Sequence, residues 1–256
     1  LGLAVAQPAR LSRSAWEEMA APLGVAVLVV AAYGQLIPAS VLRGLERGGL
    51  GVHPSLLPRH RGASPVAAAI LGGDRETGVS IFSMNRELDA GPILAQGRLA
   101  LSGAETTPEL TQRLSEQGAD LLLQVLDRLE QGPIPARPQP TTGVSYAPRL
   151  SRADGHLEWL LPAAEIGRRL RALQPWPGVT VPLGGREVKL LEGEPVAGPP
   201  GTAPGSPGQV MAMGEEAAEV QTPYGRFRVD RVLPPGGRAM SAAAYLRGRP
   251  AEKRLG

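Results

Sequence analysis

Val25-Ala-Val-Leu-Val-Val-Ala-Ala32 is an unbroken apolar run in which every second residue on average is β-branched, and Tyr33-Gly34 follows it. Runs of this kind are typical of parallel strands that are covered on both faces. The preceding residues 12–22 can form a helix that begins at Ser12 or Ser14. A helix followed by a fully buried strand indicates an α/β fold.

Downstream segments continue the α/β pattern. Residues 79–84 alternate apolar and polar side chains as a strand does, and residues 93–101 can form another strand. Thr106-x-x-Glu109 is a capping box with Pro108 in the first turn. A helical apolar stripe follows it and ends at Gly132-Pro133; its members are Leu110, Leu114, Leu121, Val125 and Leu129.

A proline-rich stretch without periodicity, residues 133–148, reads as an extended linker. We therefore predict one domain over residues 1–132 and a second over residues 149–256. The second begins with a helix near 162–173, and Gly184-Gly185 is a two-residue hairpin signal. Residues 193–208 read as a long surface loop. Short strands at 210–213, 219–222 and 226–233 are consistent with a small β-barrel.

Composition narrows the class of protein. With 256 residues, 43% of them hydrophobic, the chain can build a buried core. It has no cysteine, which removes disulfides and thiolate nucleophiles and fits a cytoplasmic protein. No apolar run reaches the eighteen residues or so of a membrane span, and the start does not resemble a signal peptide.

Positive charge is distributed unevenly. Residues 1–148 hold 12 basic and 13 acidic residues, whereas residues 149–256 hold 15 and 11, a net charge of +4. Arginines dominate, and their planar guanidinium groups suit phosphate contacts. A solvated arginine-rich face explains them about equally well. The arginines in question are Arg168, Arg169, Arg171, Arg226, Arg228, Arg231, Arg247 and Arg249.

Two motifs carry the chemistry: Gly51-Val-His-Pro-Ser-Leu-Leu-Pro-Arg-His-Arg-Gly62 and Arg86-Glu-Leu-Asp-Ala-Gly-Pro92. Taken alone, a histidine after a strand is more often structural, and an aspartate before Ala-Gly is more often a turn residue. Together the two motifs resemble the active-site signature of the folate-dependent formyltransferases. Three flanking segments are similar to the branch of that family that formylates methionyl-tRNA: Val30-Ala-Ala-Tyr-Gly34, Gly73-Asp-x-Glu-Thr-Gly78 and Gln174-Pro-Trp-Pro177.

The resemblance implies a Rossmann-like catalytic domain, a linker and a small C-terminal β-barrel that resembles an oligonucleotide-binding fold and holds tRNA. It implies transfer of a formyl group from 10-formyltetrahydrofolate to the amino group of initiator methionyl-tRNA in translation initiation. No metal is needed, and we expect a cytoplasmic monomer without membrane contact. The family's first strand, helix and second strand precede the segment with which this chain starts, so we expect the N-terminal part of the catalytic domain to be missing.

The resemblance assigns a catalytic role to His53 and Asp89. Acyl transfer needs an oxyanion stabiliser and a proton acceptor; His53 can donate to the oxyanion, and Asp89 can orient it or relay a proton through water. Gly51 departs from the family, which has Asn there as an oxyanion donor. A backbone amide or a water replaces that donor, or the chain is a weakened homologue, or its sequence has been altered.

Folate contacts are also implied by the resemblance. Ser55-Leu56-Leu57-Pro58 is the turn that contacts the folate in the family, and Tyr33 and Gly34 are expected to shape the same pocket from the end of the preceding strand. Two other functions stay open. The chain can be a non-catalytic folate- or tRNA-binding homologue, or a formyltransferase that acts on a nucleotide-sugar amine, although the latter gives the basic C-terminal domain no role.

Overall fold

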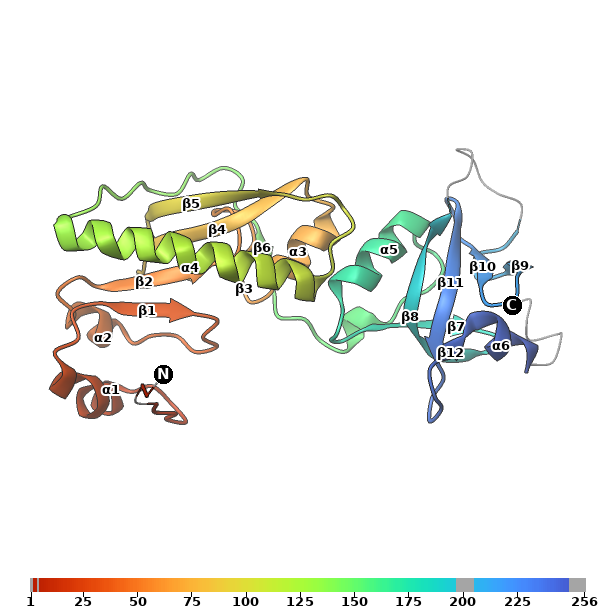
Figure 1. Cartoon of the computed structure of the whole chain (residues 1–256), viewed down its shortest axis with the longest axis horizontal. Helices are drawn as coiled ribbons and strands as arrows, with labels where there is room; N and C mark the ends of the chain where they lie inside the picture. Colours follow the sequence, from red (N-terminus) through yellow and green to blue (C-terminus); the bar gives the residue numbers. More distant parts are fainter. Residues whose placement is uncertain (1, 4, 197–204, 249–256) are drawn as a thin grey trace. The chain divides into compact units, whose positions relative to one another are not determined.

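The computed structural model describes residues 2–3, 5–196 and 205–248 (Figure 1). The chain forms two compact units. The first comprises Leu1–Pro65, Glu76–Leu101 and Thr111–Arg149, and the second comprises Val66–Arg75, Ser102–Leu110 and Leu150–Gly256. Part of the expected loop 193–208 lies outside the described residues, as does Arg249.

A four-stranded sheet in the order β1-β2-β4-β5 forms the centre of the first unit. Its β1 strand (Leu28–Ala31) runs parallel to β2 (Gly49–His53), whereas β4 (Glu76–Ser83) is antiparallel to β2 and to β5 (Ile93–Ala100). The α/β prediction is thereby confirmed, with a shorter first strand than expected. Three short helices precede β2: α1 (Arg13–Ala20), η1 (Ala21–Leu23) and α2 (Ala39–Arg43).

The long helix α4 (Thr107–Gln131) begins with the capping box that the sequence predicts. The amide of Thr106 donates to Glu109 Oε2 at 2.9 Å, and the amide of Glu109 donates to Thr106 Oγ1 at 3.5 Å. Farther along, α4 packs against the sheet at Gly118, where a Cβ would lie 3.4 Å from the side chains of Val52 and Val79. One face of β2 and β4 is therefore covered by α4 (Figure 1).

Residues 133–148 are extended, as a linker would be, but they pack onto the first unit. The strand β6 (Tyr146–Ala147) pairs in parallel with β3 (Arg61–Gly62). Arg137 and Ile93 exchange both backbone hydrogen bonds, at 2.7 and 2.8 Å. Residues 133–148 are thus part of the first unit, whereas the sequence predicts a linker between two domains.

The second unit is built on a six-stranded antiparallel sheet in the order β7-β8-β11-β10-β9, with β12 paired to β11. Gly184 and Gly185 both have positive φ, 57° and 74°, which is the geometry of the two-residue hairpin predicted between β7 and β8. In the described part of the chain, the pairing does not run on from β9 back to β7. The strands are β7 (Val179–Leu183), β8 (Arg186–Val196), β9 (Val210–Met213), β10 (Ala218–Gln221), β11 (Arg226–Leu233) and β12 (Met240–Ser241).

Helix α5 (Ala163–Ala172), expected near 162–173, covers β8 and β11, and α6 (Ala242–Arg247) packs on β11. The core between them includes Trp159 and Phe227, whose ring centroids are 6.2 Å apart. The remaining elements are α3 (Pro65–Gly72) and η2 (Ala153–Gly155). Of the helices described, none has both the length and the apolar character to cross a bilayer.

Candidate active site

His53 ends β2 on the face of the sheet opposite α4, and its side chain is buried. Its Nε2 lies 2.8 Å from the carbonyl oxygen of His60. Because a carbonyl only accepts hydrogen bonds, this contact assigns a proton to Nε2. The other ring nitrogen, Nδ1, faces the carboxylate of Asp89 at 3.6 Å.

Asp89 lies in the loop between β4 and β5, in a left-handed conformation with φ of 50°. The backbone amide of Gly62 donates to its Oδ2 at 2.8 Å, the same oxygen that faces His53. Aspartate tolerates the left-handed region better than most residues. The fold thus brings together the two predicted catalytic side chains, which are 36 positions apart in the sequence.

Burial is the main influence on the pKa of His53 and lowers it, while the charge of Asp89 acts in the opposite direction and raises it. The lowered pKa leaves the imidazole neutral near pH 7. With Nε2 holding its proton against His60, the lone pair of Nδ1 points toward an ionised carboxylate. Two acceptors face one another, so the pair is arranged to receive a proton from a donor placed beside it.

Gln139, in the expected linker, holds the Asp89 loop in place. Its Nε2 donates to the backbone carbonyls of Asp89 and Gly91 at 2.7 and 2.8 Å. Its Oε1 accepts from Arg61, at 3.2 Å from Nε and 2.6 Å from Nη2, and Arg61 is buried. Neither side chain was predicted as a site residue, because no local motif signals a contact between residues so far apart in the chain.

Gly51 lies directly opposite Phe82 in the pairing of β2 with β4. A Cβ built at Gly51 would overlap the outer atoms of the Phe82 ring, which is itself buried among Leu57 and Ile93. The aromatic ring therefore covers the position where the resemblance expects an Asn side chain. The structure leaves no room at residue 51 for a side-chain donor unless Phe82 moves.

Side chains of β4 and β5 form hydrogen bonds to the turn at residues 55–58. Ser80 Oγ donates to the Ser55 carbonyl at 2.7 Å and accepts from the Leu57 amide at 3.1 Å, and Gln96 donates to the Leu57 carbonyl at 3.0 Å. Ser55 and Leu57 are buried, whereas Leu56 and Pro58 are partly exposed. The partly exposed pair is thus the part of the turn that a ligand can reach.

Tyr33 and Gly34 follow β1, and Tyr33 is exposed. Since β1 and β2 are parallel, with Ala31 opposite Val52, both residues follow the carboxyl end of β1, next to the carboxyl end of β2 where His53 lies. Open α/β sheets bind ligands at the carboxyl ends of their strands. No direct contact joins Tyr33 or Gly34 to His53 or Asp89 among the described side-chain hydrogen bonds.

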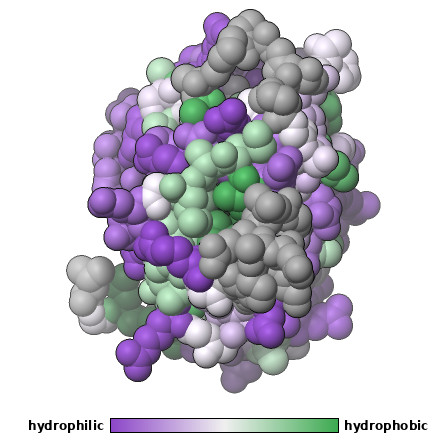
Figure 2. Space-filling model, turned by 90° about the vertical axis from the view of Figure 1, so that its right-hand side faces the viewer, coloured by the Kyte–Doolittle hydropathy of each residue, from purple (hydrophilic) through white to green (hydrophobic). Residues whose placement is uncertain are grey.

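The second unit presents a largely hydrophilic face with a smaller apolar strip (Figure 2). The arginines of β11 that the sequence singles out are each within ion-pair distance of a carboxylate: Arg226 with Glu219 at 3.1 Å, Arg228 with Asp230 at 2.9 Å, and Arg231 with Glu192 at 2.7 Å. Their charges are therefore partly compensated. The described residues contain no cluster of three or more potential metal ligands.

Comparison with known proteins gives a consistent family. The formyl transferase model matches residues 3–126, and the model of the formyl transferase C-terminal domain matches residues 149–250. A methionyl-tRNA formyltransferase of Paracoccus denitrificans is 42% identical over 260 residues, 100% of this chain and 82% of the relative. A methionyl-tRNA formyltransferase of Thermus thermophilus is 44% identical over 248 residues, 96% of this chain and 78% of the relative.

Solved structures share the fold at low sequence identity. A variant of HypX from Aquifex aeolicus superposes with a TM-score of 0.69 at 21% identity, covering 93% of this chain and 42% of that one. The N-formyltransferase from Helicobacter canadensis, solved with folinic acid and dTDP-3-aminofucose, gives a TM-score of 0.61 at 16% identity, covering 79% and 72%.

Proposed function

Because the chain belongs to the formyl transferase family, we propose that it transfers a formyl group from 10-formyltetrahydrofolate to the amino group of initiator methionyl-tRNA. The observation that carries the proposal is the pair of His53 Nδ1 and Asp89 Oδ2, 3.6 Å apart, at the carboxyl end of β2. Relatives that carry the methionyl-tRNA formyltransferase name and span nearly the whole chain support the choice of acceptor.

His53 and Asp89 have different roles in the proton transfer. A neutral His53 accepts the proton that the attacking amine loses, at Nδ1, and Asp89 stabilises the imidazolium so formed. The new Nδ1–H can donate to the developing oxyanion or to the departing folate nitrogen. Nε2 cannot share that task, because it keeps its proton and donates it in a hydrogen bond to the His60 carbonyl. Gly51 contributes no side chain to the reaction.

The folate site is part of the same proposal. Leu56 and Pro58 supply partly exposed apolar surface, and Ser55 and Leu57 shape the turn from inside, with Tyr33 and Gly34 at the same edge of the sheet. Such a combination of apolar walls and few polar groups suits a flat heterocycle. No metal is required in this scheme.

The finer architecture also belongs to the proposal. Residues 1–132 would form the catalytic domain and residues 149–256 a barrel-like tRNA-binding domain that resembles the oligonucleotide-binding fold. The antiparallel sheet of β7 to β12 supports that assignment. We also propose that the protein acts as a monomer in the cytoplasm, where its tRNA substrate is made.

A competition assay tests the choice of substrate. The protein is supplied with labelled 10-formyltetrahydrofolate and equal concentrations of methionyl-tRNA and a nucleotide-sugar amine. Label should appear on the charged tRNA. Label on the sugar amine alone would contradict the proposed acceptor.

A non-catalytic homologue that still binds folate or tRNA is the second candidate. The observation that favours it is the Phe82 ring over Gly51, since losing one oxyanion donor typically costs about a hundred- to thousandfold in rate. Tight binding of tRNA and folate without any formylated product would support this candidate over the enzyme.

A further inference from the structure

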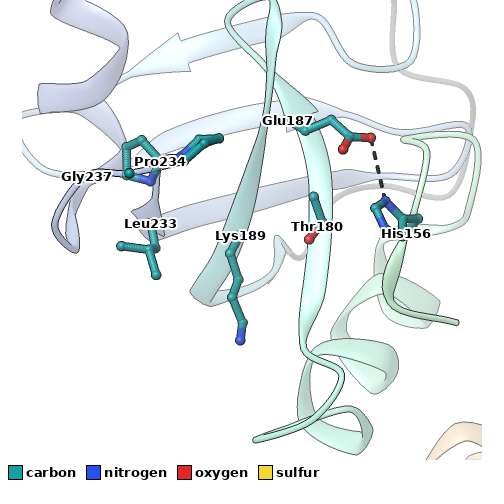
Figure 3. Close-up of a pocket in the computed structure, with 9 residues that line it drawn as sticks. His156, Thr180, Glu187, Lys189, Leu233, Pro234 and Gly237 are labelled. Carbon is teal, nitrogen blue, oxygen red and sulfur yellow. Dashed lines mark ion pairs between the residues drawn. The ribbon is translucent and has the colours of Figure 1, made fainter. Parts of the chain in front are cut away.

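The outward face of the second unit's sheet carries an open hollow of about 390 Å³ (Figure 3). Its floor is made by three neighbouring strands, because Lys189 of β8 lies opposite Thr180 of β7 and opposite Leu233 of β11. His156 borders the hollow beside β7, and the loop of residues 234–237 borders it beside β11. All of these residues belong to one compact unit.

Lys189 supplies a positive charge to the hollow. Its ammonium has no hydrogen bond or ion pair within residues 5–196 and 205–248. The end of the side chain lies against Gly178, where an added Cβ would overlap Cε and Nζ, so a glycine at this position leaves the ammonium its space. The carboxylate of Glu187 also lines the hollow and lies 3.6 Å from His156 Nδ1, a contact that is an ion pair when the imidazole is protonated (Figure 3).

The arginines of the neighbouring strand differ from Lys189 because each has a carboxylate partner. On β11, the strand beside it, Arg226, Arg228 and Arg231 are each ion-paired with a carboxylate. An anion that approached those arginines would have to compete with the carboxylate already bound. At Lys189 it would meet an unpaired ammonium and the hydroxyl of half-buried Thr180 on the paired strand.

We infer that this hollow binds a phosphate of an RNA backbone, with Lys189 as the cation and Thr180 as a second donor. The inference rests on the proposed function, in which the substrate is a tRNA, and it adds a specific contact in the second unit. Leu233 and Pro234 provide an apolar wall against which a ribose can lie. Contacts of this kind position an RNA without reading its sequence.

Salt-dependent binding of tRNA tests the inference. Lys189→Ala should weaken the affinity for uncharged initiator tRNA and for an elongator tRNA by the same factor. The slope of log affinity against log salt concentration should fall by about one, as expected for one lost phosphate contact. Arg186→Ala is the matched control, since it removes one positive charge from the same strand outside the hollow. We expect it to leave the slope unchanged.

Four outcomes would overturn the inference. Equal slopes for Lys189→Ala and wild type, or equal losses in Lys189→Ala and Arg186→Ala, would show that the hollow makes no specific contact. Inorganic phosphate that binds wild type but not Lys189→Ala, with unchanged tRNA affinity, would identify a site for free phosphate. A wild-type chain that formylates methionyl-tRNA in those cases keeps the proposed function intact. One that neither binds nor formylates tRNA would remove both.

Discussion

The two ring nitrogens of His53 face different partners, and this arrangement determines which of them can accept a proton. The Nε2–H of His53 donates a hydrogen bond to the His60 carbonyl, and Nδ1 faces Asp89. The motifs in the sequence identify both side chains. They do not identify which nitrogen reacts, because that depends on a carbonyl seven residues away whose direction is set by the folded loop.

The pH dependence of the formylation rate follows from this arrangement. Burial lowers the pKa of His53 from its usual 6.5, so the neutral, proton-accepting form should persist below that pH. Asp89 raises the pKa of His53, so Asp89→Asn should move the acid limb of the single-turnover rate to still lower pH. Rates of the two proteins on one substrate preparation provide the comparison. An acid limb that moves to higher pH in Asp89→Asn would contradict the assigned interaction.

Gln139 is a positioning residue, since it touches the Asp89 loop and no reacting atom. Gln139→Glu keeps an acceptor for Arg61 but removes the N–H donors to the Asp89 and Gly91 carbonyls. We expect kcat to fall by up to about 10²-fold, because small displacements of catalytic groups cost that much, while KM for tRNA stays the same. Gln112→Glu on the exposed face of α4 is the control. A wild-type kcat in Gln139→Glu would show that the loop needs no such support.

The Phe82 ring limits which side chains fit at position 51. Gly51→Asn alone should be destabilising by about 1–3 kcal/mol, as overpacking in a filled core is. Adding Phe82→Leu removes the ring atoms that conflict and should recover stability. If the amide then reaches the oxyanion, the double variant should react about 10²- to 10³-fold faster than Phe82→Leu alone. Denaturant unfolding and formylation assays measure both effects. A fully stable Gly51→Asn would show that the ring is not an obstacle.

At the scale of elements, short sequence motifs correctly predict those features that depend on neighbouring residues. The capping box of α4 and the Gly184-Gly185 hairpin form as predicted, since both depend on residues close together in the chain. β2 and α3 were not predicted as elements. β2 has two glycines among its five residues, and α3 is apolar without a clear periodicity, so each depends on packing against neighbours.

Residues 133–148 illustrate the same limit. Proline content predicts an extended conformation but carries no information about what the extended chain contacts. Its contacts with Arg61 and with the Asp89 loop join residues about 50 to 80 positions apart. No periodic pattern reports such pairs, so this part of the candidate site became visible only in the structure.

The turn before α4 gives a prediction about stability and pH. Burial acts to raise the pKa of Glu105, but hydrogen bonds from the Ser102 and Gly103 amides to its carboxylate outweigh it and lower the pKa to about 2. The stabilisation is therefore complete above the unfolded value of 4.5 and is lost as pH falls toward 2.

Glu105→Gln should consequently be less stable than wild type at pH 7, and the difference in unfolding free energy should shrink between pH 4.5 and 3. Denaturant titrations at several pH values measure it. Glu130→Gln, at the exposed end of the same helix, serves as the control. A difference that stays constant over that range would refute the role of the Glu105 carboxylate.

At the scale of the whole molecule, the two units would divide the work of one enzyme. The first carries the proton-accepting pair, and the second carries the hydrophilic sheet and the Lys189 hollow. The sequence left two roles open for the arginines of the later half, RNA binding and a solvated face. Those of β11 are ion-paired with carboxylates. The proposed phosphate contact is Lys189, which no count of basic residues could have singled out.

The most direct test of the central claim compares formylation of methionyl-tRNA by wild type, His53→Ala and Asp89→Asn. Wild type should form formylmethionyl-tRNA from 10-formyltetrahydrofolate. Each variant should be at least about 10²-fold slower, because His53→Ala removes the general base and Asp89→Asn removes the carboxylate that stabilises its protonated form. Circular dichroism and tRNA affinity should be unchanged. Near wild-type turnover in His53→Ala would contradict the assigned chemistry. A wild-type chain that binds tRNA but forms no product would contradict the proposed enzymatic function.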